Sequence, residues 1–283
     1  KSRLVESNTD RLQNIERNVT TVVGVNKFTK TETSPLVSGD GGIMIVDPAV
    51  EKDQIDRLNL WRSNRNEKLV NKALLSLRQA ALNGKNIMPH SIEAAKAGAT
   101  TGEWAQEMRD IYGEYRGPTG VATGISNKTD GLDELRSAVD AVSDKLGERL
   151  KFLMGKPGLD GHSNGAEQIA SRARDCGMKI EYQGIRLTPQ ELVENVKSTK
   201  AHVVGLSILS GSHIPLVQDM INLLAEEGLT KIPIIVGGII PEEDKIKLLE
   251  MGISKVYTPK DFEMNTIMMD IVNLAEPKEL AAE

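Results

Sequence analysis

In the second half of the chain, short apolar runs rich in β-branched residues alternate with longer amphipathic stretches. Such runs are typical of strands that are buried on both faces of a sheet. They occupy residues 149–154, 179–182, 202–208, 232–236 and 255–257. The amphipathic stretches have helical periodicity and cover residues 164–176, 189–199, 214–227, 242–251 and 262–274. This alternation predicts an α/β fold with a doubly wound, five-stranded parallel sheet of flavodoxin-like size.

Residues that start and stop helices support this division. Thr188 precedes Pro189, a pair that favours a helix N-terminus with the threonine as its capping residue. Three glycines follow predicted helices, where glycine commonly ends a helix: Gly177, Gly228 and Gly252. We expect a ligand to bind on the loops at the carboxyl ends of the strands, as in other open parallel sheets.

The first half is less regular. Residues 19–28 and 42–46 have the apolar character of buried strands, and residues 38–42 between them are expected to form a turn. Residues 51–82 show a broadly helical spacing of apolar positions, and residues 101–112 predict a further helix. These elements do not make an obvious domain by themselves, so we expect them to belong to a larger one.

A change of composition separates the two halves. Residues 115–130 are rich in Gly, Thr, Ser and Pro, which favours an extended or turning chain. We therefore predict a first domain over residues 1–114, a linker over 115–147 and a second domain over 148–283.

Composition and charge exclude several classes of protein. No apolar run reaches the roughly 18 to 20 residues that a membrane span needs. With 35 basic and 40 acidic side chains the net charge is -5, so neither a nucleic acid nor an anionic membrane is an expected partner. Cys176 is the single cysteine, which excludes an internal disulfide and a cysteine-based metal cluster. This fits a reducing compartment, and we expect a cytoplasmic protein.

The most informative motif follows the first strand of the predicted sheet and runs from Asp160 through His162 to Gly165. A histidine on this loop lies at the carboxyl edge of the sheet, where a metal can reach it. Asp160 is close enough to accept a hydrogen bond from the other ring nitrogen, which would orient the ring and make it a stronger ligand. Alone, the motif is equally consistent with a loop histidine that binds nothing.

Two further motifs lie at matching positions of the sheet. Ser207 and Leu209 end the third strand, with 41 residues between Gly165 and Ser207. Gly237 with Gly238 ends the fourth, with 27 residues between Leu209 and Gly237. The first, third and fourth strands are neighbours in a flavodoxin-like sheet, so the three motifs are expected to line one crevice.

Together these motifs resemble the cobalamin-binding domains of mutases and methyltransferases, in which DxHxxG is followed by SxL and then by GG at this spacing. The resemblance implies that His162 is the lower axial ligand of cobalt, in place of the cofactor's own base, and that Asp160 is its hydrogen-bonding partner. Both would act in catalysis by positioning and tuning the metal.

The same resemblance implies a slot for the detached nucleotide tail of the cofactor. Ser207 would hydrogen-bond the buried base, Leu209 would pack on it, and the two glycines would keep the backbone close where a Cβ would collide. The cofactor-binding residues implied in this way are Gly161, His162, Ser163, Asn164, Gly165, Ile169, Ser207, Leu209, Gly211, Gly237, Gly238, Tyr257 and Thr258.

The first half resembles the end of the substrate barrel and the linker of acyl-CoA mutases, through VVGVNKF, SPLVSGDGGIMIVD, NIMPHSIEAAKAGATTGEW and IYGEYRGPTGV. Within the methylmalonyl-CoA mutase family, the chain most resembles the ethylmalonyl-CoA mutases in three segments: KPGLDGHSNGAEQIA, GLSILSGSHIPLV and VGGIIPEED. The methylmalonyl enzymes more often have a KMGQDGHDRG-type loop.

This resemblance implies an adenosylcobalamin-dependent rearrangement of a branched acyl-CoA, from ethylmalonyl-CoA to methylsuccinyl-CoA. Isomerisation of methylmalonyl-CoA to succinyl-CoA is the alternative. Residues 1–114 would be an α/β remnant of a TIM-type barrel, which needs about 250 residues, so most of the acyl-CoA site would precede Lys1. We therefore expect the C-terminal part of a larger mutase, inactive alone, that associates with the rest of the barrel or forms a homodimer.

Three other classes remain open. A corrinoid methyl carrier would bind methylcobalamin and need a methyltransferase partner, and a cobalamin sensor would couple the sheet to an output domain. A response regulator would need a phosphoacceptor aspartate at the end of the third strand, where Ser207 stands.

Overall fold

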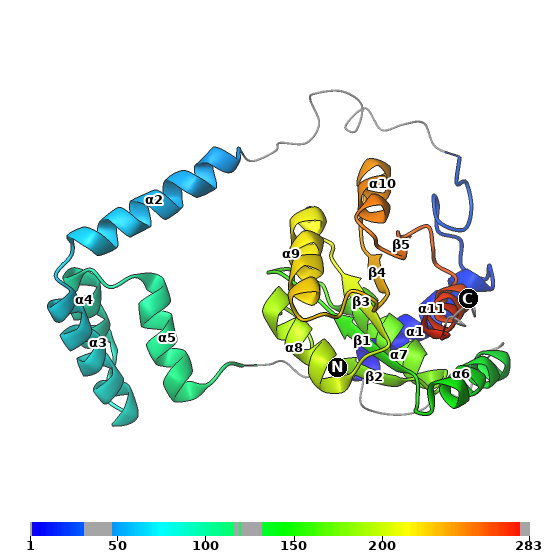
Figure 1. The fold of residues 1–283 in the computed structure, drawn as a ribbon, viewed down its shortest axis with the longest axis horizontal. Coiled ribbons are helices and arrows are strands. Elements are labelled where there is room, and N and C mark those ends of the chain that lie inside the picture. The colour runs from blue at the N-terminus through cyan, green and yellow to red at the C-terminus, as the bar shows by residue number, and fades with distance from the viewer. Residues whose placement is uncertain (1, 31–46, 116–118, 120–131, 278–283) are drawn as a thin grey trace, which may run out of the picture. The chain divides into compact units, whose positions relative to one another are not determined.

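The computed structural model describes residues 2–30, 47–115, 119 and 132–277. It divides into two compact units: a sheet unit of Lys1–Thr31 with Gly117–Glu283, and a helical unit of Glu32–Arg116. Figure 1 shows both units as ribbons. Among the described residues, no helix is both long enough and apolar enough to cross a bilayer.

The sheet unit contains five parallel strands in the order β2-β1-β3-β4-β5. This is the flavodoxin-like order, so the predicted fold class is confirmed for the second half of the chain. In register, Met154 pairs with Gly205 and Ser207 pairs with Gly237. The strands are β1 (Lys151–Gly155), β2 (Lys179–Tyr182), β3 (Val203–Ser207), β4 (Ile234–Gly237) and β5 (Lys255–Tyr257).

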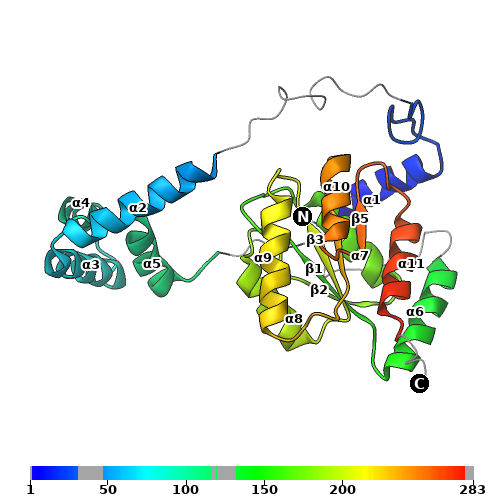
Figure 2. The same cartoon turned by 45° about the horizontal axis from the view of Figure 1, so that its top comes forward.

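Helices cover both faces of this sheet, as Figures 1 and 2 show. Phe152 and Met154 pack on one face with α6, α7 and α11, whereas Leu153 packs on the other face with α8 and α9. Successive residues of β1 therefore point to opposite faces and both are buried, as expected for a parallel sheet. The helices are α6 (Leu132–Leu146), α7 (Asn164–Asp175), α8 (Pro189–Thr199), α9 (His213–Glu226), α10 (Glu242–Glu250) and α11 (Met264–Ala275).

The predicted helix ends are confirmed. The Thr188 side chain accepts from the backbone N–H of Glu191, and the Glu191 side chain accepts from the backbone N–H of Thr188. This reciprocal pair is a capping box. The three glycines that were expected to end helices have the left-handed backbone that favours glycine, with φ of 88° at Gly177, 71° at Gly228 and 97° at Gly252.

The predicted linker, 115–147, contains a helix, α6. Its apolar side chains recur at helical spacing and are buried against the core of the sheet unit: Leu132, Leu135, Val139 and Val142. A helix with such a stripe gains free energy by packing on the sheet, so the sheet unit begins before residue 148.

The prediction of a strand over residues 19–28 was wrong. Val19, Val23 and Phe28 are exposed, and the segment forms turns with a single bridge between Val23 and Lys27. Gly24 has a φ of 79°, which an extended strand cannot accommodate. The preceding helix α1 (Ser2–Glu16) lies against α7.

The helical unit contains α2 (Pro48–Asn64), α3 (Glu67–Leu82), α4 (Met88–Ala97) and α5 (Thr101–Tyr112). The helical stretch predicted over 51–82 is therefore two helices, because Asn66 caps the start of α3 by accepting from the backbone N–H of Leu69 at 3.2 Å. The described residues of this unit form no strand. The strand predicted at 42–46 and the turn at 38–42 lie outside the described residues.

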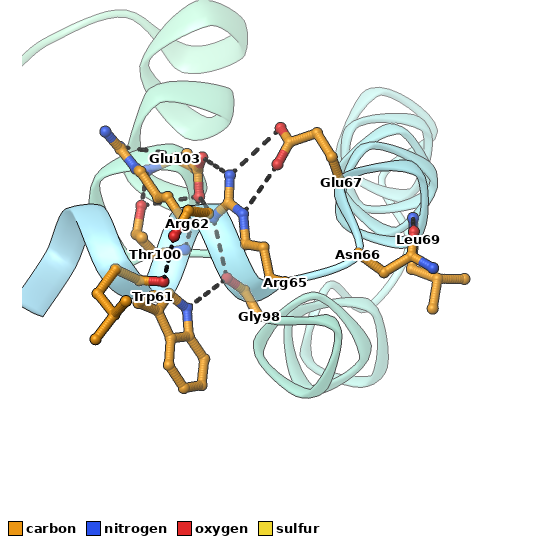
Figure 3. Close-up of polar contacts among 11 residues, drawn as sticks. Trp61, Arg62, Arg65, Asn66, Glu67, Leu69, Gly98, Thr100 and Glu103 are labelled. Carbon is orange, nitrogen blue, oxygen red and sulfur yellow. Dashed lines mark hydrogen bonds and ion pairs between the residues drawn. The ribbon is translucent and has the colours of Figure 1, made fainter.

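A polar network joins the helices of this unit (Figure 3). The guanidinium of Arg65 donates to Glu103 at 2.6 and 2.8 Å and to the backbone oxygen of Gly98 at 3.1 Å. The indole N–H of Trp61 donates to the same oxygen at 3.0 Å. Glu103 also accepts from Thr100, its partner in the capping box of α5. All the groups named in this network belong to the helices of this unit or to their capping residues.

Candidate functional site

The loop between β1 and α7 holds Asp160 and His162 in direct contact. One carboxylate oxygen of Asp160 accepts from the backbone N–H of His162 at 3.0 Å and from its ring Nδ1 at 2.6 Å. The aspartate side chain is 5% exposed, whereas the histidine side chain is 81% exposed. Because an ionised carboxylate can only accept, Nδ1 carries a proton, and in the neutral ring the lone pair is then on Nε2. The arrangement therefore presents one nitrogen ligand to the surroundings.

Lys156 supports this pair from inside the protein. Its Nζ donates to the second carboxylate oxygen of Asp160 at 3.0 Å and to the backbone oxygen of Ser207 at 3.0 Å. The lysine side chain is fully buried. The same aspartate oxygen accepts from the backbone N–H of Leu209 at 3.3 Å. Asp160 thus ties the histidine loop after β1 to the end of β3, which joins two of the predicted motifs.

These contacts decide the charge of Asp160. Burial raises the pKa of this carboxyl, but hydrogen bonds from the backbone and ring of His162 and from Lys156 outweigh burial and hold the pKa well below its ordinary range. Asp160 therefore stays ionised near neutral pH and remains an acceptor for the Nδ1 proton.

A cavity of about 360 Å³ opens at the carboxyl edge of the sheet, between the ends of β3, β4 and β5 and the start of α7. Its lining is mainly apolar. The predicted cofactor-binding residues that line it are Gly165, Ile169, Ser207, Leu209, Gly237, Gly238, Tyr257 and Thr258. The other predicted residues do not line this cavity: Gly161, His162, Ser163 and Gly211 belong to neighbouring loops, and Asn164 is the first residue of α7.

The two glycines of the GG motif have different reasons to be glycine. A Cβ on Gly238 would lie 1.9 Å from the backbone oxygen of Ile208, so the fold itself forbids a side chain there. A Cβ on Gly237 would meet nothing within 4 Å. A collision within the protein therefore occurs at Gly238, whereas the space beside Gly237 is the cavity and a collision there with a bound cofactor stays a prediction.

Tyr257 and Thr258 lie at the end of β5. The hydroxyl of Tyr257 donates to Asp270 at 2.8 Å, and burial followed by this bond raises the pKa of the phenol far above its ordinary value. The backbone N–H and the hydroxyl of Thr258 both donate to Asp261, at 2.7 and 3.0 Å. Both side chains line the cavity, and both hydroxyl groups already donate a hydrogen bond to an aspartate of the chain.

Two family models match the chain: a methylmalonyl-CoA mutase model over residues 1–114 and a B12 binding domain model over residues 150–259. The second range contains every predicted cofactor-binding residue. The ethylmalonyl-CoA mutase of Cereibacter sphaeroides is 60% identical over 283 residues, which are 100% of this chain and 43% of that protein. The chain belongs to the methylmalonyl-CoA mutase family.

Within this family, the similarity is higher to ethylmalonyl-CoA mutases. The enzyme of that name from Methylorubrum extorquens is 51% identical over 277 residues, covering 98% of this chain and 40% of that protein. The methylmalonyl-CoA mutase of Cereibacter sphaeroides is 31% identical over 263 residues, covering 92% and 36%. The chain thus spans about two fifths of the length of these relatives.

Two solved structures are also similar. A cobalamin-binding protein from Desulfitobacterium hafniense has a TM-score of 0.39 at 17% identity, over 80% of this chain and 99% of its own. The monomethylamine corrinoid protein of Methanosarcina barkeri has a TM-score of 0.36 at 13% identity, over 72% and 96%. The fold assignment rests on the strand order described above.

Two features of the site in this mutase-family chain were not predicted from the sequence. Lys156 was not singled out, although a lysine that directly follows a buried strand, four residues before Asp160, was a usable signal. The cavity also has a wall formed by Arg11, Leu12, Ile15, Val22 and Val25, far away in the sequence. No local motif marks that wall.

The other two histidines of the sheet unit, His202 and His213, have structural partners. His213 is buried, and its Nε2 lies 2.8 Å from Asp244. The Nδ1 atom of His202 accepts from the backbone N–H of Lys151 at 2.9 Å. These contacts leave His162 as the histidine that faces outward beside the cavity.

Proposed function

We propose that this chain is the cobalamin-binding part of an adenosylcobalamin-dependent acyl-CoA mutase that converts ethylmalonyl-CoA to methylsuccinyl-CoA. The observation that carries the proposal is the contact chain from buried Lys156 through Asp160 to exposed His162, beside an apolar cavity at the sheet edge. A single histidine supplies one ligand, which suits a cobalt that brings its corrin nitrogens with it.

The residues present fit this cofactor. Asp160 accepts from Nδ1 of His162 and so selects the neutral tautomer in which Nε2 offers its lone pair to a metal. The cavity is apolar enough for an aromatic base, with Ser207 as a polar group on its wall. The empty space beside Gly237 would receive part of the nucleotide tail, where a side chain would compete with it.

When bound, adenosylcobalamin supplies the carbon radical that removes a hydrogen atom from the substrate. The chain's own residues bind and orient. His162 would hold the cobalt, and Asp160 would fix the ring and raise its basicity. Lys156 keeps Asp160 charged and in place between β1 and β3. Gly161, Ser163 and Gly211, with Asn164 at the start of α7, would surround the corrin, a role that we infer from the family pattern.

The substrate is inferred from the relatives. Identity of 60% and 51% to two ethylmalonyl-CoA mutases, against 31% to a methylmalonyl-CoA mutase, favours the ethyl substrate. Residues that bind acyl-CoA would lie in the part of the mutase that this chain does not span, in a TIM-type barrel. We further propose that the whole mutase is cytoplasmic, since Cys176 is the single cysteine of this chain and is buried as a free thiol. Its assembly as a homodimer stays a prediction.

The test compares the 283-residue chain with a longer mutase that contains it. Each is mixed with adenosylcobalamin and either ethylmalonyl-CoA or methylmalonyl-CoA, and the isomerised product is assayed. We expect turnover by the longer protein alone, faster with the ethyl substrate and lost in His162→Ala. Equal or faster turnover of methylmalonyl-CoA would make the chain part of a methylmalonyl-CoA mutase. Absence of all turnover by a longer protein that binds cobalamin would favour a methyl carrier or a sensor.

A further inference from the structure

The cavity at the sheet edge has a second wall that the cobalamin motifs do not include. Its residues come from the C-terminal half of α1 and the turn that follows: Arg11, Leu12, Ile15, Val22 and Val25. Ile15 is buried, and Leu12, Val22 and Val25 are half-buried. The opposite wall is formed by the ends of the strands. A cavity that is apolar on both sides therefore separates α1 from the sheet.

Specific contacts hold this second wall against the sheet unit. The helix α1 lies against α7 in both views (Figures 1 and 2), and the Thr9 hydroxyl donates to Gln168 at 3.0 Å. At the end of α1, the side chain of Glu16 accepts from the backbone N–H of Met264 at 2.9 Å. These two contacts fix α1 to the starts of α7 and α11, which flank the cavity.

The turn after α1 is fixed by one side chain. The amide nitrogen of Asn26 donates to the backbone oxygens of Ile15 and Thr20, at 2.9 and 2.8 Å. The amide oxygen of Asn26 accepts from the backbone N–H of Val22 at 2.8 Å. Asn26 thereby folds the turn back onto the end of α1. This arrangement places Val22 and Val25 on the cavity while Val23, between them, is 72% exposed.

We propose that Arg11, Leu12, Ile15, Val22 and Val25 form the outer wall of the site for the nucleotide tail of cobalamin. The inference rests on the proposed cofactor. The cavity of about 360 Å³ is at the small end of ligand sites, which span about 300 to 1,000 Å³, and suits a tail rather than a whole corrin. The aliphatic residues would cover the aromatic base, and Arg11 supplies a cation for the phosphate of the tail.

The segment is a wall and not a plug because the cavity stays open while the segment is in place. A plug would fill the space between Ser207 and Gly237 with its own side chains, and binding of the tail would require the segment to leave. A wall instead adds apolar contact area to the bound tail, so its loss weakens binding.

The first test is protection of a cysteine introduced on the wall. Val25→Cys faces the cavity, and Val23→Cys in the same turn is its matched control, while the native Cys176 is buried. Alkylation is followed with no ligand, with adenosylcobalamin, and with adenosylcobinamide, which has the corrin but lacks the nucleotide tail. We expect adenosylcobalamin to slow alkylation of Val25→Cys at least several-fold. Adenosylcobinamide should leave it unchanged, and neither ligand should affect Val23→Cys.

The second test measures affinity by equilibrium dialysis. Leu12→Asp puts a charge on the wall, whereas Leu4→Asp puts the same charge on a residue of α1 that is 69% exposed. We expect Leu12→Asp to weaken adenosylcobalamin binding about ten-fold, because a carboxylate replaces apolar contact. Its affinity for adenosylcobinamide, and both affinities of Leu4→Asp, should equal those of the unaltered chain.

The outcomes separate the two proposals. If the unaltered chain binds neither ligand, the proposed cofactor is wrong and the wall has no tail to cover. If it binds both, but Val25→Cys is not protected by adenosylcobalamin or is protected equally by adenosylcobinamide, the wall proposal fails while the cofactor assignment stands. Tighter adenosylcobalamin binding by Leu12→Asp would show that the segment obstructs the site.

Discussion

Each unit of the chain contains a pair of a cation and a carboxylate that is largely shielded from solvent, and the two pairs differ in what else they contact. The side chains of Arg65 and Glu103 are 6% and 22% exposed, and those of Lys156 and Asp160 are 0% and 5% exposed. In the helical unit, Arg65 and Glu103 contact each other and the backbone of α4 and α5, so the network closes within the helices (Figure 3). In the sheet unit, Lys156 and Asp160 lead to His162, which is 81% exposed. A buried ion pair gains little stability over an apolar pair of the same shape.

This difference distinguishes an ion pair that stabilises the fold from an ion pair that also supports a binding site. The pair in the helical unit joins elements of the fold and has no outward ligand. The pair in the sheet unit joins β1 to β3 and also fixes the tautomer of an outward-facing ring. We therefore expect substitutions in the first pair to change stability alone, and substitutions in the second to change stability and cofactor binding together.

The largest expected effect is that of Lys156→Met. Removing one partner of a buried pair leaves Asp160 buried and charged, which costs about 3 to 5 kcal/mol of unfolding free energy. We also expect weaker adenosylcobalamin binding, because Asp160 loses the donor that holds it. Denaturant unfolding and dialysis measure the two effects. The matched variant Arg65→Met should destabilise the helical unit without changing binding, and reduced binding in that variant would refute the distinction.

The GG motif offers a second contrast. Gly238→Ala places a Cβ against the backbone oxygen of Ile208, so we expect a loss of about 1 to 3 kcal/mol in stability from overpacking. Gly237→Ala meets no atom of the chain and should unfold at the unaltered temperature, but it should bind adenosylcobalamin more weakly. Thermal melts with dialysis test both. Unchanged affinity of Gly237→Ala would mean that the tail does not use that space.

Asp160→Asn should leave the sheet folded and weaken the axial ligand. An amide is a poorer acceptor for the Nδ1 proton, and the loss of such a partner costs about 10- to 100-fold in metal affinity or activity. The visible spectrum of bound cobalamin and its dissociation constant report this effect. Glu103→Gln, the corresponding change in the helical unit, is the control and should leave both unaltered.

The smallest expected effect is on the acid stability of the helical unit. The side-chain hydrogen bond from Arg65 lowers the pKa of Glu103 to about 2, against the opposing effect of burial. Because the folded pKa is below the unfolded one, this stabilisation is complete above about pH 4.5 and is lost as the pH falls toward 2. Glu103→Gln should therefore flatten the stability curve in that window. An unchanged slope would show that the carboxyl is not coupled to folding.

The sheet could be predicted from the sequence because the patterns that mark its strands and helix ends are local. Apolar runs mark strands that are buried on both faces, and Thr188 and Gly177 mark helix ends by their own backbone requirements. The site motifs were readable for the same reason, since parallel strands bring their carboxyl ends to one edge. His162 and Asp160 contact each other as their spacing predicted.

The features that were not predicted from the sequence depend on contacts between segments far apart in the chain. Residues 19–28 have the β-branched composition of a strand, but Asn26 folds them into a turn against α1. A lysine is buried only when its partners are in place, and the partners of Lys156 come from the loop after β1 and from the end of β3. The second cavity wall comes from residues 11–25, which no spacing rule connects to the strand ends that form the opposite wall.

The central claim is that His162 binds cobalt through Nε2, and electron paramagnetic resonance tests it most directly. The cob(II)alamin complex is prepared with the chain carrying histidine labelled with nitrogen-15 in the imidazole, and with the unlabelled chain. Ligation by His162 predicts that labelling changes the nitrogen splitting of the cobalt lines from a triplet to a doublet, and that labelled His162→Ala loses the doublet. An unchanged triplet in the labelled complex would show that the cofactor's own base remains on cobalt and would contradict the account.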